Sequence, residues 1–578
     1  MNGIGCLYAV LLVLLSQTVV VQPTARRLHH RRYSRSVESE DPESILDSYV
    51  IGVVEFRPEP SDIDVRSRTG QHLDAYADLV RSDNAKVTDI IVFPELTLNT
   101  FSDSVFVPDP STQVVPCENS TRFVLPFLSC LAAEVRKYLV INLSEIFNCK
   151  SNSTEVTQPC APHGFVWYNT DVVFDRNGAV IARYRKSNLL GKSGETDRTT
   201  YVPEIVTFET DFGVKFGLIT RSDVLLAKPA LELVKQGVND LIMPAMWQAE
   251  LPFLTSTQVY ESWAFTNNVN LIVAGGNHEA TGNTGTGVFN GRSGAILSYV
   301  TGEPTRRLFP VRIPKTPGVR TANHIPLESS DTETGRLHGK FLEEINIERD
   351  FLEQFTTLQI NPERYHDRIG QIICNGFFCC EFSVVLTIVP DQDVTHYYRF
   401  AVFDGYRSFS KYSSETHVST CGIIMCRNQS LSSCGLPMNE NSNYLAFNEI
   451  VISGKFQANG TLAMANSLDD MLHPLSVDQY TFYSSVNYST NQQDVQLNLV
   501  SGSVANLQTF AIYAINHENF EYFNPIEAPP EPSTVSPTIE YAVGEDDTGG
   551  SSKTTTASGA LQALLLVMLL VSTVRELR

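Results

Sequence analysis

Three charged residues stand at the ends of apolar segments, where enzymes often place the side chains that do chemistry. Glu95 follows the apolar segment of residues 89–93, and Lys186 follows the segment of residues 179–185. Arg221 stands at the abrupt end of a third such segment. Taken singly, each is also typical of an ordinary solvated loop. Brought together at the carboxyl ends of strands, a carboxylate could act as a general base and an ammonium group could stabilise a negatively charged oxygen.

The surroundings of Arg221 have the pattern of a strand that stops and turns into a helix, which is how enzymes present a nucleophile. A guanidinium cannot take that role, because it is not deprotonated in proteins and has no lone pair to offer an acyl carbon. No cysteine lies between Cys160 and Cys374. Ser222 is one residue further along the turn, where its side chain leaves in another direction, and serine is a poor nucleophile without an aligned base. The residues therefore predict an enzyme scaffold without its nucleophile.

Strands and helices alternate between residue 49 and about residue 308. The expected strands are residues 50–56, 89–93, 214–220, 241–243 and 271–274. The expected helices are residues 71–87, 230–236 and 257–268. Continuous apolar strands alternating with helices predict an α/β sheet that is covered on at least one face.

Beyond residue 320 the sequence lacks long helical periodicity. Short segments typical of strands lie at residues 383–389, 396–403, 449–452 and 496–500. We therefore expect an α/β domain over residues 49–324 and a β-rich domain over residues 325–523.

Length and charge limit the possible functions. The chain has 578 residues, enough for two or three domains, and a net charge of −21. This acidity argues against nucleic acid or an anionic membrane surface as an electrostatic partner. The sequence indicates no cofactor and no particular protein partner.

The cysteines fall into two groups once the first apolar segment is set aside. The groups are Cys117, Cys130, Cys149 and Cys160, then Cys374, Cys379, Cys380, Cys421, Cys426 and Cys434. In a secreted chain these groups predict two disulfide frameworks in separate domains. Metal ligation is the weaker alternative, because no pair of histidines stands at ligand spacing beside either group.

The N-terminal segments indicate entry into the secretory pathway. Residues 1–22 contain a short apolar run and are predicted to be a signal peptide, although its first residues lack Lys and Arg. Residues 23–48 form a basic segment, either a processing site or a solvated tail. Six Asn-X-Ser/Thr sequons fit a secreted glycoprotein, at Asn119, Asn142, Asn152, Asn428, Asn459 and Asn487.

The C-terminal segments predict a lipid anchor. Residues 524–552 are rich in Pro, Ser and Thr and form a stalk without apolar periodicity. Residues 553–578 combine a polar spacer with an apolar tail, as in a GPI-attachment signal, and the candidate attachment window is Gly549, Gly550, Ser551 and Ser552. A single transmembrane helix is the alternative, although the apolar run is short for a span of about 20 residues.

Several stretches resemble the vanin and biotinidase branch of the nitrilase superfamily, over almost the whole mature chain. The matching stretches are residues 91–95, 168–175, 182–189, 203–208, 243–247 and 374–380, with the spacing of Cys421, Cys426 and Cys434. The resemblance implies a nitrilase-like α-β-β-α sandwich followed by a β-rich vanin-type domain. It also implies an amidohydrolase ancestry, with substrates such as pantetheine or biotinyl amides.

In that family a Glu, a Lys and a Cys hydrolyse an amide. The resemblance places Glu95 at the position of the general base and Lys186 at the position that stabilises the oxyanion. The family pattern Thr-Cys-aromatic-Asp matches residues 220–223 without a gap, so Arg221 occupies the position of the nucleophile. Glu195 matches a further acidic residue that orients the lysine, in a loop one residue longer than expected.

Two hypotheses of different class follow from this pattern. The first is a cell-surface pseudoenzyme that binds a small amide-like ligand without hydrolysing it, and in which Arg221 pairs with Glu95. The second is an active amidohydrolase that works through Ser222 or an unforeseen arrangement. A third possibility is that the pocket is filled and the protein acts only through its glycosylated surface. The identity of residue 221 favours the first.

The anchor assignment can be tested on intact cells. We expect phosphatidylinositol-specific phospholipase C to release the protein, and residues 560–578 to be absent from the mature chain by mass spectrometry, because a GPI transamidase removes such a tail. A lipase-resistant protein that retains this tail would instead carry a transmembrane helix.

Overall fold

The computed structural model describes ten segments of the chain, all within one structural unit of residues 1–523. These segments are residues 47–118, 123–150, 164–187, 203–319, 336–361, 368–389, 392–408, 415–438, 444–500 and 502–517. The predicted signal peptide, most of the basic segment, the stalk and the anchor signal lie outside them. In the described segments, no helix is both long enough and apolar enough to cross a membrane.

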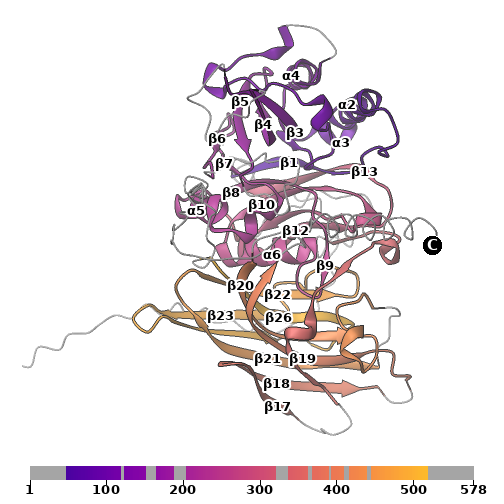
Figure 1. Cartoon of the computed structure of the whole chain (residues 1–578), viewed down its shortest axis with the longest axis vertical. Helices are drawn as coiled ribbons and strands as arrows, with labels where there is room; N and C mark the ends of the chain where they lie inside the picture. The colour runs from indigo at the N-terminus through magenta and orange to yellow at the C-terminus, as the bar shows by residue number, and fades with distance from the viewer. Residues whose placement is uncertain are drawn as a thin grey trace, which may run out of the picture. The chain divides into compact units, whose positions relative to one another are not determined.

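Thirteen strands of the first half form two stacked layers (Figure 1). The first layer has the order β13 (Arg306–Pro314), β1 (Ser48–Phe56), β2 (Ile90–Val92), β3 (Tyr138–Asn148), β4 (Phe165–Phe174) and β5 (Val180–Arg185). The second has the order β6 (Thr207–Glu209), β7 (Lys215–Leu218), β8 (Asp240–Ala245), β10 (Asn270–Gly276), β11 (Thr286–Asn290), β12 (Ala295–Val300) and β14 (Arg336–His338). The layers join where Glu55 and Phe56 of β1 pair with Gly275 and Gly276 of β10.

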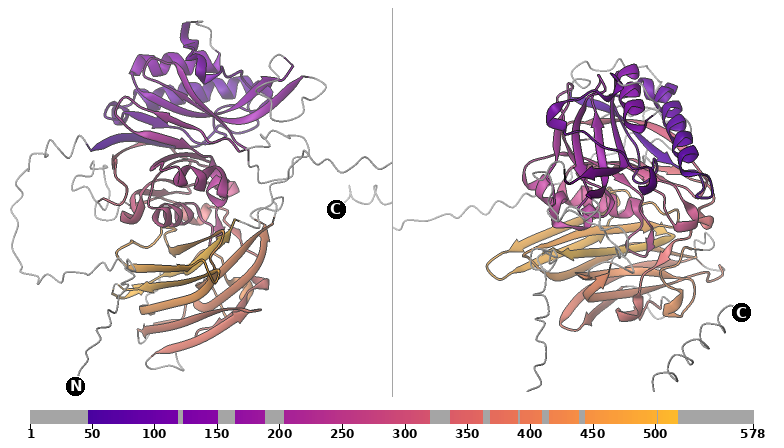
Figure 2. Two further views of the ribbon diagram at one scale, coloured as in Figure 1. Left: turned by 90° about the vertical axis from the view of Figure 1, so that its left-hand side faces the viewer. Right: turned by 45° about the horizontal axis from the view of Figure 1, so that its top comes forward.

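Apolar side chains fill the space between the two layers and cover their outer faces. Ile51 and Val53 of β1 pack in one cluster with Ile242 of β8 and Ile272 of β10. Because strands with two covered faces are apolar throughout, all of β1 after its first residue is buried. Helices α2 (Val65–Arg81) and α4 (Val124–Val135) cover the first layer, and α6 (Ser256–Asn267) covers the second (Figure 2). This arrangement confirms the predicted α-β-β-α sandwich.

Helix α2 begins six residues before the predicted start at residue 71. Asp64 caps it by accepting a hydrogen bond from the Ser67 backbone N–H at 3.1 Å. The apolar stripe that faces the sheet starts only at Leu73, so the polar first turns gave no periodic signal. The helix ends at Arg81, and the short helix α3 (Asp83–Lys86) accounts for most of the rest of the predicted segment.

The second half forms two further sheets, as predicted for the β-rich part. One has the order β16 (Thr356–Gln359), β19 (Tyr397–Ser408), β20 (Glu415–Cys426), β26 (Leu507–Asn516) and β22 (Thr461–Asp469). The other has the order β17 (Ile369–Asn375), β18 (Phe378–Ile388), β21 (Leu445–Gln457), β24 (Gln492–Leu499) and β23 (Tyr480–Asn487), with β25 (Val504–Ala505) beside β21. A separate apolar cluster fills the space between them.

The two halves share a hydrophobic core around α6. Tyr260 and Trp263 of α6 pack in one cluster with Met464 of β22 and Tyr513 of β26. Residues 256–264 are all buried, so α6 has no solvent-exposed face along this stretch. Its low amphipathicity has the same cause, because a helix enclosed on all sides needs no polar stripe.

A buried ion-pair cluster also crosses between the halves. Arg407 of β19 pairs with Glu250 of β9 (Glu250–Leu251) and with Asp350, and it donates a hydrogen bond to the Tyr513 hydroxyl at 2.8 Å. Strand β9 itself pairs with β15 (Glu348–Arg349). Burial raises the pKa of Glu250 to about 7. Since removing one partner of a buried pair leaves a charge uncompensated, this cluster ties the β-rich half to the α/β half.

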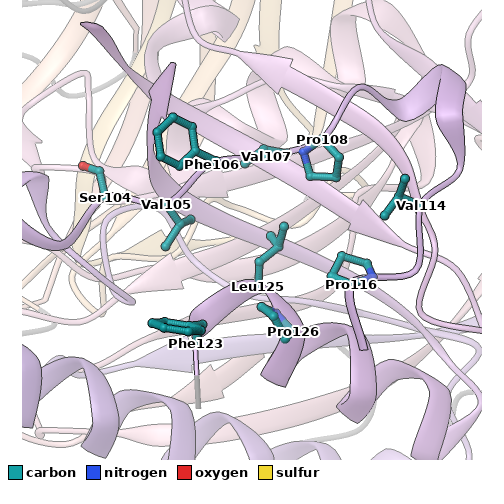
Figure 3. Close-up of a pocket in the computed structure, with 10 residues that line it drawn as sticks. All are labelled: Ser104, Val105, Phe106, Val107, Pro108, Val114, Pro116, Phe123, Leu125 and Pro126. Carbon is teal, nitrogen blue, oxygen red and sulfur yellow. The ribbon is translucent and has the colours of Figure 1, made fainter. Parts of the chain in front are cut away.

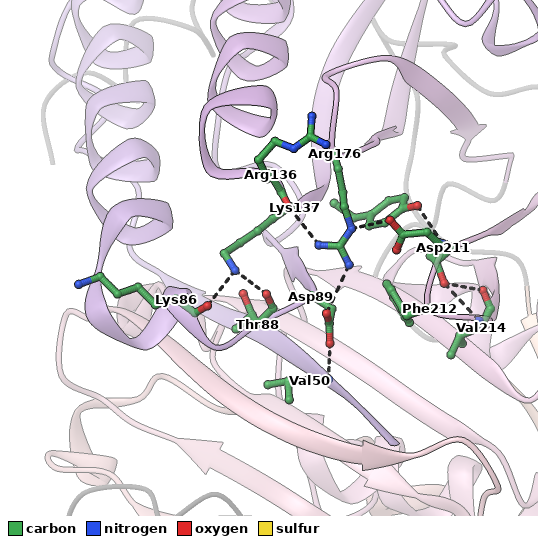
Figure 4. Close-up of polar contacts among 12 residues, drawn as sticks. Val50, Lys86, Thr88, Asp89, Arg136, Lys137, Arg176, Asp211, Phe212 and Val214 are labelled. Atoms are coloured by element: carbon green, nitrogen blue, oxygen red, sulfur yellow. Dashed lines mark hydrogen bonds and ion pairs between the residues drawn. The ribbon is translucent and has the colours of Figure 1, made fainter. Parts of the chain in front are cut away.

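A second ion-pair network lies where β2 and β3 begin (Figure 4). The Arg176 guanidinium reaches Asp211 at 2.7 Å and Asp89 at 3.3 Å, and it lies 5.2 Å from the centre of the Tyr138 ring. Lys137 donates hydrogen bonds to backbone carbonyls, including that of Thr88 at 2.5 Å. Arg176 and Lys137 therefore both have partners, which is typical of cations with a structural role.

The disulfides follow the two predicted groups. Four bonds join Cys117 to Cys130, Cys374 to Cys379, Cys380 to Cys421 and Cys426 to Cys434. Cys149 is disulfide-bonded as well, and Cys160 lies outside the described residues. No free thiol is therefore found in the described part of the chain.

The buried carboxyl of Glu261 on α6 predicts how stability changes with pH. Burial raises its pKa to about 7, whereas an unfolded chain releases the proton near pH 4.5. The folded state thus holds a proton that the unfolded state loses, so the free energy of unfolding should fall as pH rises from about 4.5 to 7. The free energy of unfolding can be measured by urea titration at pH 5 and at pH 8. We expect its decrease between these two pH values to be roughly 2–3 kcal/mol smaller in Glu261→Gln than in the native protein.

The exposed residue Glu343 provides the matched control. Glu343→Gln should keep the pH dependence of the native chain, which also includes the buried carboxyls of Glu55 and Asp171 with pKa values raised to about 7. If the free energy of unfolding fell equally with pH in Glu261→Gln and in the native protein, the prediction would be wrong.

Candidate active site

Glu95 lies at the centre of a buried polar site, directly after β2. It is 1% exposed, and its Oε1 accepts hydrogen bonds from Lys186 Nζ and Asn169 Nδ2, each at 2.8 Å. Its Oε2 accepts a hydrogen bond from the Met246 backbone N–H at 3.2 Å. Lys186 is 3% exposed and follows β5. The structure therefore brings together the two residues that the sequence assigned to the base and the oxyanion position.

Arg221 lies near this pair but does not form the expected ion pair with Glu95. Burial raises the pKa of Glu95, but the charges of Lys186 and Arg221 outweigh this effect and hold that pKa below its usual value. Among the described residues, no carboxylate lies within ion-pair distance of Arg221, which is half-buried. The expectation that Arg221 would form an ion pair with Glu95 is wrong: Lys186 is the cation that contacts the Glu95 carboxylate, and Arg221 acts on it only through its charge.

Arg221 sits at the tip of the turn after β7 in a left-handed backbone conformation, with a φ of 46°. Such a conformation costs a non-glycine residue about 1–2 kcal/mol and persists only where the surroundings hold it. Asp223 Oδ2 accepts hydrogen bonds from the Thr220 backbone N–H and the Tyr184 hydroxyl, each at 2.7 Å. The Thr220 hydroxyl donates to Asp171 Oδ2 at 2.7 Å. The turn keeps the sharp geometry typical of a nucleophile although its tip carries a guanidinium.

Ser222 has no base in hydrogen-bond contact among the described residues. It is 2% exposed, and its Oγ has no hydrogen-bond partner among the described residues. A serine nucleophile needs a base within about 2.6–3.2 Å to take its proton. The structure therefore gives Ser222 no means of activation.

A network of hydrogen bonds among buried side chains holds Asn169 and the backbone next to Glu95 in place. Asn142 Nδ2 donates to Asn169 Oδ1 at 2.6 Å and to Asp171 Oδ1 at 2.8 Å. Asn142 Oδ1 accepts from the Leu96 backbone N–H at 2.9 Å, which fixes the residue next to Glu95. Burial raises the pKa of Asp171 to about 7. In the sequence, these three residues stand out as polar positions inside the apolar strands β3 and β4, whereas the predicted site residues stand at strand ends.

The assignment of Asn142 as a glycosylation site is wrong. Asn142 is fully buried in β3, and its amide donates to two side chains of the site. A glycan needs an amide that reaches solvent. Asn428, Asn459 and Asn487 are exposed, and Asn119 and Asn152 lie outside the described residues, as does Glu195.

The residues just before Lys186, Arg183 to Arg185, are also largely buried, although neighbouring basic residues are usually solvated. Arg185 Nε donates to Glu145 Oε2 at 2.9 Å, and the Arg185 guanidinium lies 4.4 Å from the centre of the Tyr168 ring. Side chains alternate along β5, so Tyr184 reaches the turn that carries Arg221 while Arg185 points to the other side. The segment therefore positions Lys186 from both faces of the strand.

Tyr260 of α6 is a further residue of the site that the sequence did not reveal. Its hydroxyl is buried and has no hydrogen-bond partner among the described residues. Burial raises the pKa of Tyr260 well above its usual value, the charge of Arg221 lowers it, and Glu55 and Glu95 raise it. Tyr260 is therefore neutral at physiological pH, and its ring belongs to the same apolar cluster as Ile219 and Val224, which flank the tip of the Arg221 turn.

A groove elsewhere on the first half lacks these chemical groups (Figure 3). It has a volume of about 530 Å³ and lies between the N-terminus of α4 and the segment of residues 104–116. Its lining residues are Ser104, Val105, Phe106, Val107, Pro108, Val114, Pro116, Phe123, Leu125 and Pro126. None of them is an acid or a base, so the groove cannot do acid–base chemistry. Among the described residues, no group of His, Cys, Asp and Glu could hold a metal ion.

Comparison with known proteins agrees with this architecture. Residues 60–298 match the carbon-nitrogen hydrolase model, and residues 345–520 match the vanin C-terminal domain model. The chain is 36% identical to vanin-like protein 2 of Drosophila melanogaster over 82% of its own length and 90% of that protein. The chain belongs to the vanin and biotinidase family.

More distant relatives bear names that describe enzymes. The chain is 30% identical to biotinidase of Takifugu rubripes, over 72% of this chain and 85% of that protein. It is 28% identical to pantetheinase of Mus musculus, over 67% of this chain and 73% of that protein. Among solved structures, Nit3 of Saccharomyces cerevisiae matches 46% of this chain and 90% of its own, with 17% identity and a TM-score of 0.34.

The buried ion pair of the site should contribute strongly to stability. Glu95→Ala would leave the Lys186 ammonium buried without its carboxylate, which we expect to lower the free energy of unfolding by about 3–5 kcal/mol in urea titrations. Lys186→Met in the Glu95→Leu background should recover much of this loss, because both charges are then absent.

The exposed ion pair of Arg81 and Glu134 provides the control. Glu134→Ala should cost less than about 1 kcal/mol, as is usual for ion pairs in water. A Glu95→Ala variant as stable as Glu134→Ala would show that the site is open and hydrated.

Proposed function

We propose that this member of the vanin and biotinidase family is a cell-surface glycoprotein whose amidohydrolase scaffold binds a small ligand without hydrolysing it. The observation that carries the proposal is the position of Arg221, at the tip of the turn after β7 and beside the buried pair of Glu95 and Lys186. In the family pattern this position belongs to the cysteine nucleophile. Hydrolysis through a thioester would need a sulfur atom where this chain has a guanidinium.

The rest of the site retains the features that amide hydrolysis would use. The low pKa of Glu95 keeps it ionised at neutral pH, as a base requires. Lys186 Nζ lies beside it, where an ammonium could stabilise a tetrahedral oxyanion. Neither group can form the acyl-enzyme bond, and all described cysteines are in disulfides. The site therefore supports ligand binding better than turnover.

An active amidohydrolase that uses Ser222 is the alternative. The structure argues against it, because the Ser222 hydroxyl is buried and no base among the described residues accepts its proton.

The names of the relatives supply the class of ligand. Biotinidase and pantetheinase are relatives over about two thirds of this chain or more, so we propose a small ligand related to a biotinyl or pantothenyl amide. The exposed sequons at Asn428, Asn459 and Asn487 and the predicted anchor support a location on the outer cell surface.

Replacing the guanidinium by a thiol tests the proposal directly. The native protein should release no amine from pantetheine or from a biotinyl amide, whereas Arg221→Cys should hydrolyse at least one of them about 100-fold or more above Arg221→Ala. The reason is that Glu95, Lys186 and the sharp turn are already in place for a nucleophile.

Two further variants separate the possible outcomes. Adding Glu95→Gln to Arg221→Cys should abolish the gained activity, since the base is then neutral. Turnover by the native protein that Ser222→Ala removes would overturn the proposal in favour of the active amidohydrolase.

A further inference from the structure

Three buried polar side chains stand in one row across strands β3, β4 and β5. Asn142 of β3 lies directly opposite Asp171 of β4, and Asp171 lies directly opposite Tyr184 of β5. Because side chains alternate along a strand, residues that pair across neighbouring strands project from the same face of the sheet. Tyr184 packs in the apolar cluster between the two layers. The whole row therefore faces the second layer.

This row bonds to the turn after β7, which belongs to the second layer. Asp171 Oδ2 accepts a hydrogen bond from the Thr220 hydroxyl at 2.7 Å. The Tyr184 hydroxyl donates to Asp223 Oδ2, also at 2.7 Å. Thr220 and Asp223 stand on either side of Arg221 in the chain. A shift of residue 221 would therefore strain buried hydrogen bonds to two strands of the first layer.

The same row supports the position of the general base. Asp171 Oδ1 accepts from Asn142 Nδ2 at 2.8 Å, and Asn142 Nδ2 also donates to Asn169 Oδ1 at 2.6 Å. Asn169 Nδ2 in turn donates to Glu95 Oε1 at 2.8 Å. An unbroken series of hydrogen bonds therefore runs from Glu95 to Thr220, and Asp171 is the member that joins its two ends.

We propose that Asp171 is a positioning residue that holds the turn carrying residue 221 at a fixed distance from Glu95. It acts through Asn142 on one side and through Thr220 on the other. A carboxylate suits this position because each of its oxygens accepts from a different neighbour, whereas an asparagine has one acceptor oxygen only. This role rests on the proposed function, because it takes residue 221 and Glu95 as the nucleophile and base positions of an amidase scaffold.

Loss of the Asp171 carboxylate should loosen both ends of the site. Burial raises the pKa of Asp171 to about 7, and the hydrogen bonds from Thr220 and Asn142 oppose this shift. The charge of Glu95 raises that pKa further, and the charge of Lys186 lowers it. Asp171→Leu would leave the Thr220 hydroxyl and one Asn142 N–H without an acceptor, which is unfavourable inside a protein. The turn and the base could then move relative to each other.

Unfolding equilibria of the mature glycoprotein, measured by urea titration, test this coupling. Asn169→Ala and Thr220→Val each remove one end of the series, and their effects on the equilibrium constant for unfolding multiply if the two ends are independent. We expect the double variant to differ from that product by at least about threefold, because members of one hydrogen-bond network interact by such amounts. In an Asp171→Leu background the two effects should simply multiply.

Asp240, at the start of β8, provides a matched control. It is likewise a buried carboxylate, and it accepts from the Tyr49 hydroxyl at 2.7 Å and from Asn270 Nδ2 at 2.8 Å. The candidate active site lies beyond the other end of this strand. Asp240→Leu should therefore destabilise the fold but leave the interaction between Asn169 and Thr220 unchanged.

Catalysis by the Arg221→Cys variant gives a measurement that a merely structural role would not change. Adding Asp171→Leu should lower its kcat at least about 10-fold and leave KM within about twofold, because displacing a nucleophile from its base slows the reaction without weakening substrate binding. Asp171→Asn should recover part of this loss, since it keeps one acceptor oxygen. Asp240→Leu should leave kcat unchanged.

Three results would overturn the role of Asp171. The first is independent effects of Asn169→Ala and Thr220→Val, and the second is an interaction between them that persists in Asp171→Leu. If Asp171→Leu does not fold, an undiminished interaction in Asp171→Asn has the same meaning. The third is an unchanged kcat when either Asp171 variant is added to Arg221→Cys. An inactive Arg221→Cys variant refutes the proposed function instead, and the unfolding measurements then decide the role of Asp171 without any turnover.

Discussion

The ion pair of Glu95 and Lys186 is the interaction on which the site depends. Both groups are almost fully buried, and a buried charge is tolerated only where a partner and further hydrogen bonds compensate it. Asn169 and the Met246 backbone supply those bonds, and Asn142 fixes Asn169 in turn. Strands β2, β3, β4, β5 and β8 each contribute a group to this arrangement or lie next to one, so the order of the sheets and the geometry of the site are coupled.

Arg221 places a guanidinium at the tip of a sharp strand-to-helix turn, a geometry that enzymes use to present nucleophiles. Thr220 and Asp223 cap the turn, and Tyr184 and Asp171 hold those two residues from neighbouring strands. The tip remains in a left-handed conformation that arginine adopts only at a cost. Hydrogen bonds from two neighbouring strands therefore hold a strained backbone conformation at a residue that is itself half-buried.

The β-rich half completes the core of the α/β half. Helix α6 would expose one face in a sandwich that ended at β14, and β22 and β26 cover that face. Tyr260 lies on this helix, so the β-rich half also determines the environment of a residue of the site. The ion pairs of Arg407 with Glu250 and Asp350 add a charged contact to the apolar one. This shared core explains why one structural unit contains both halves.

The sequence by itself determined the fold class, the grouping of the cysteines and the identity of the residue at the tip of the turn. These properties depend on local periodicity, on short spacings and on a single side chain, all of which are visible in one dimension. Only the tertiary structure decided that Lys186 rather than Arg221 pairs with Glu95, because that choice depends on distances of a few ångströms between strands far apart in the chain. It also decided that Asn142 is buried and that residues 256–264 of α6 are enclosed on all sides, since burial depends on which elements pack together. Nothing near Tyr260 in the sequence indicates that it packs in the same apolar cluster as Ile219 and Val224 of the Arg221 turn.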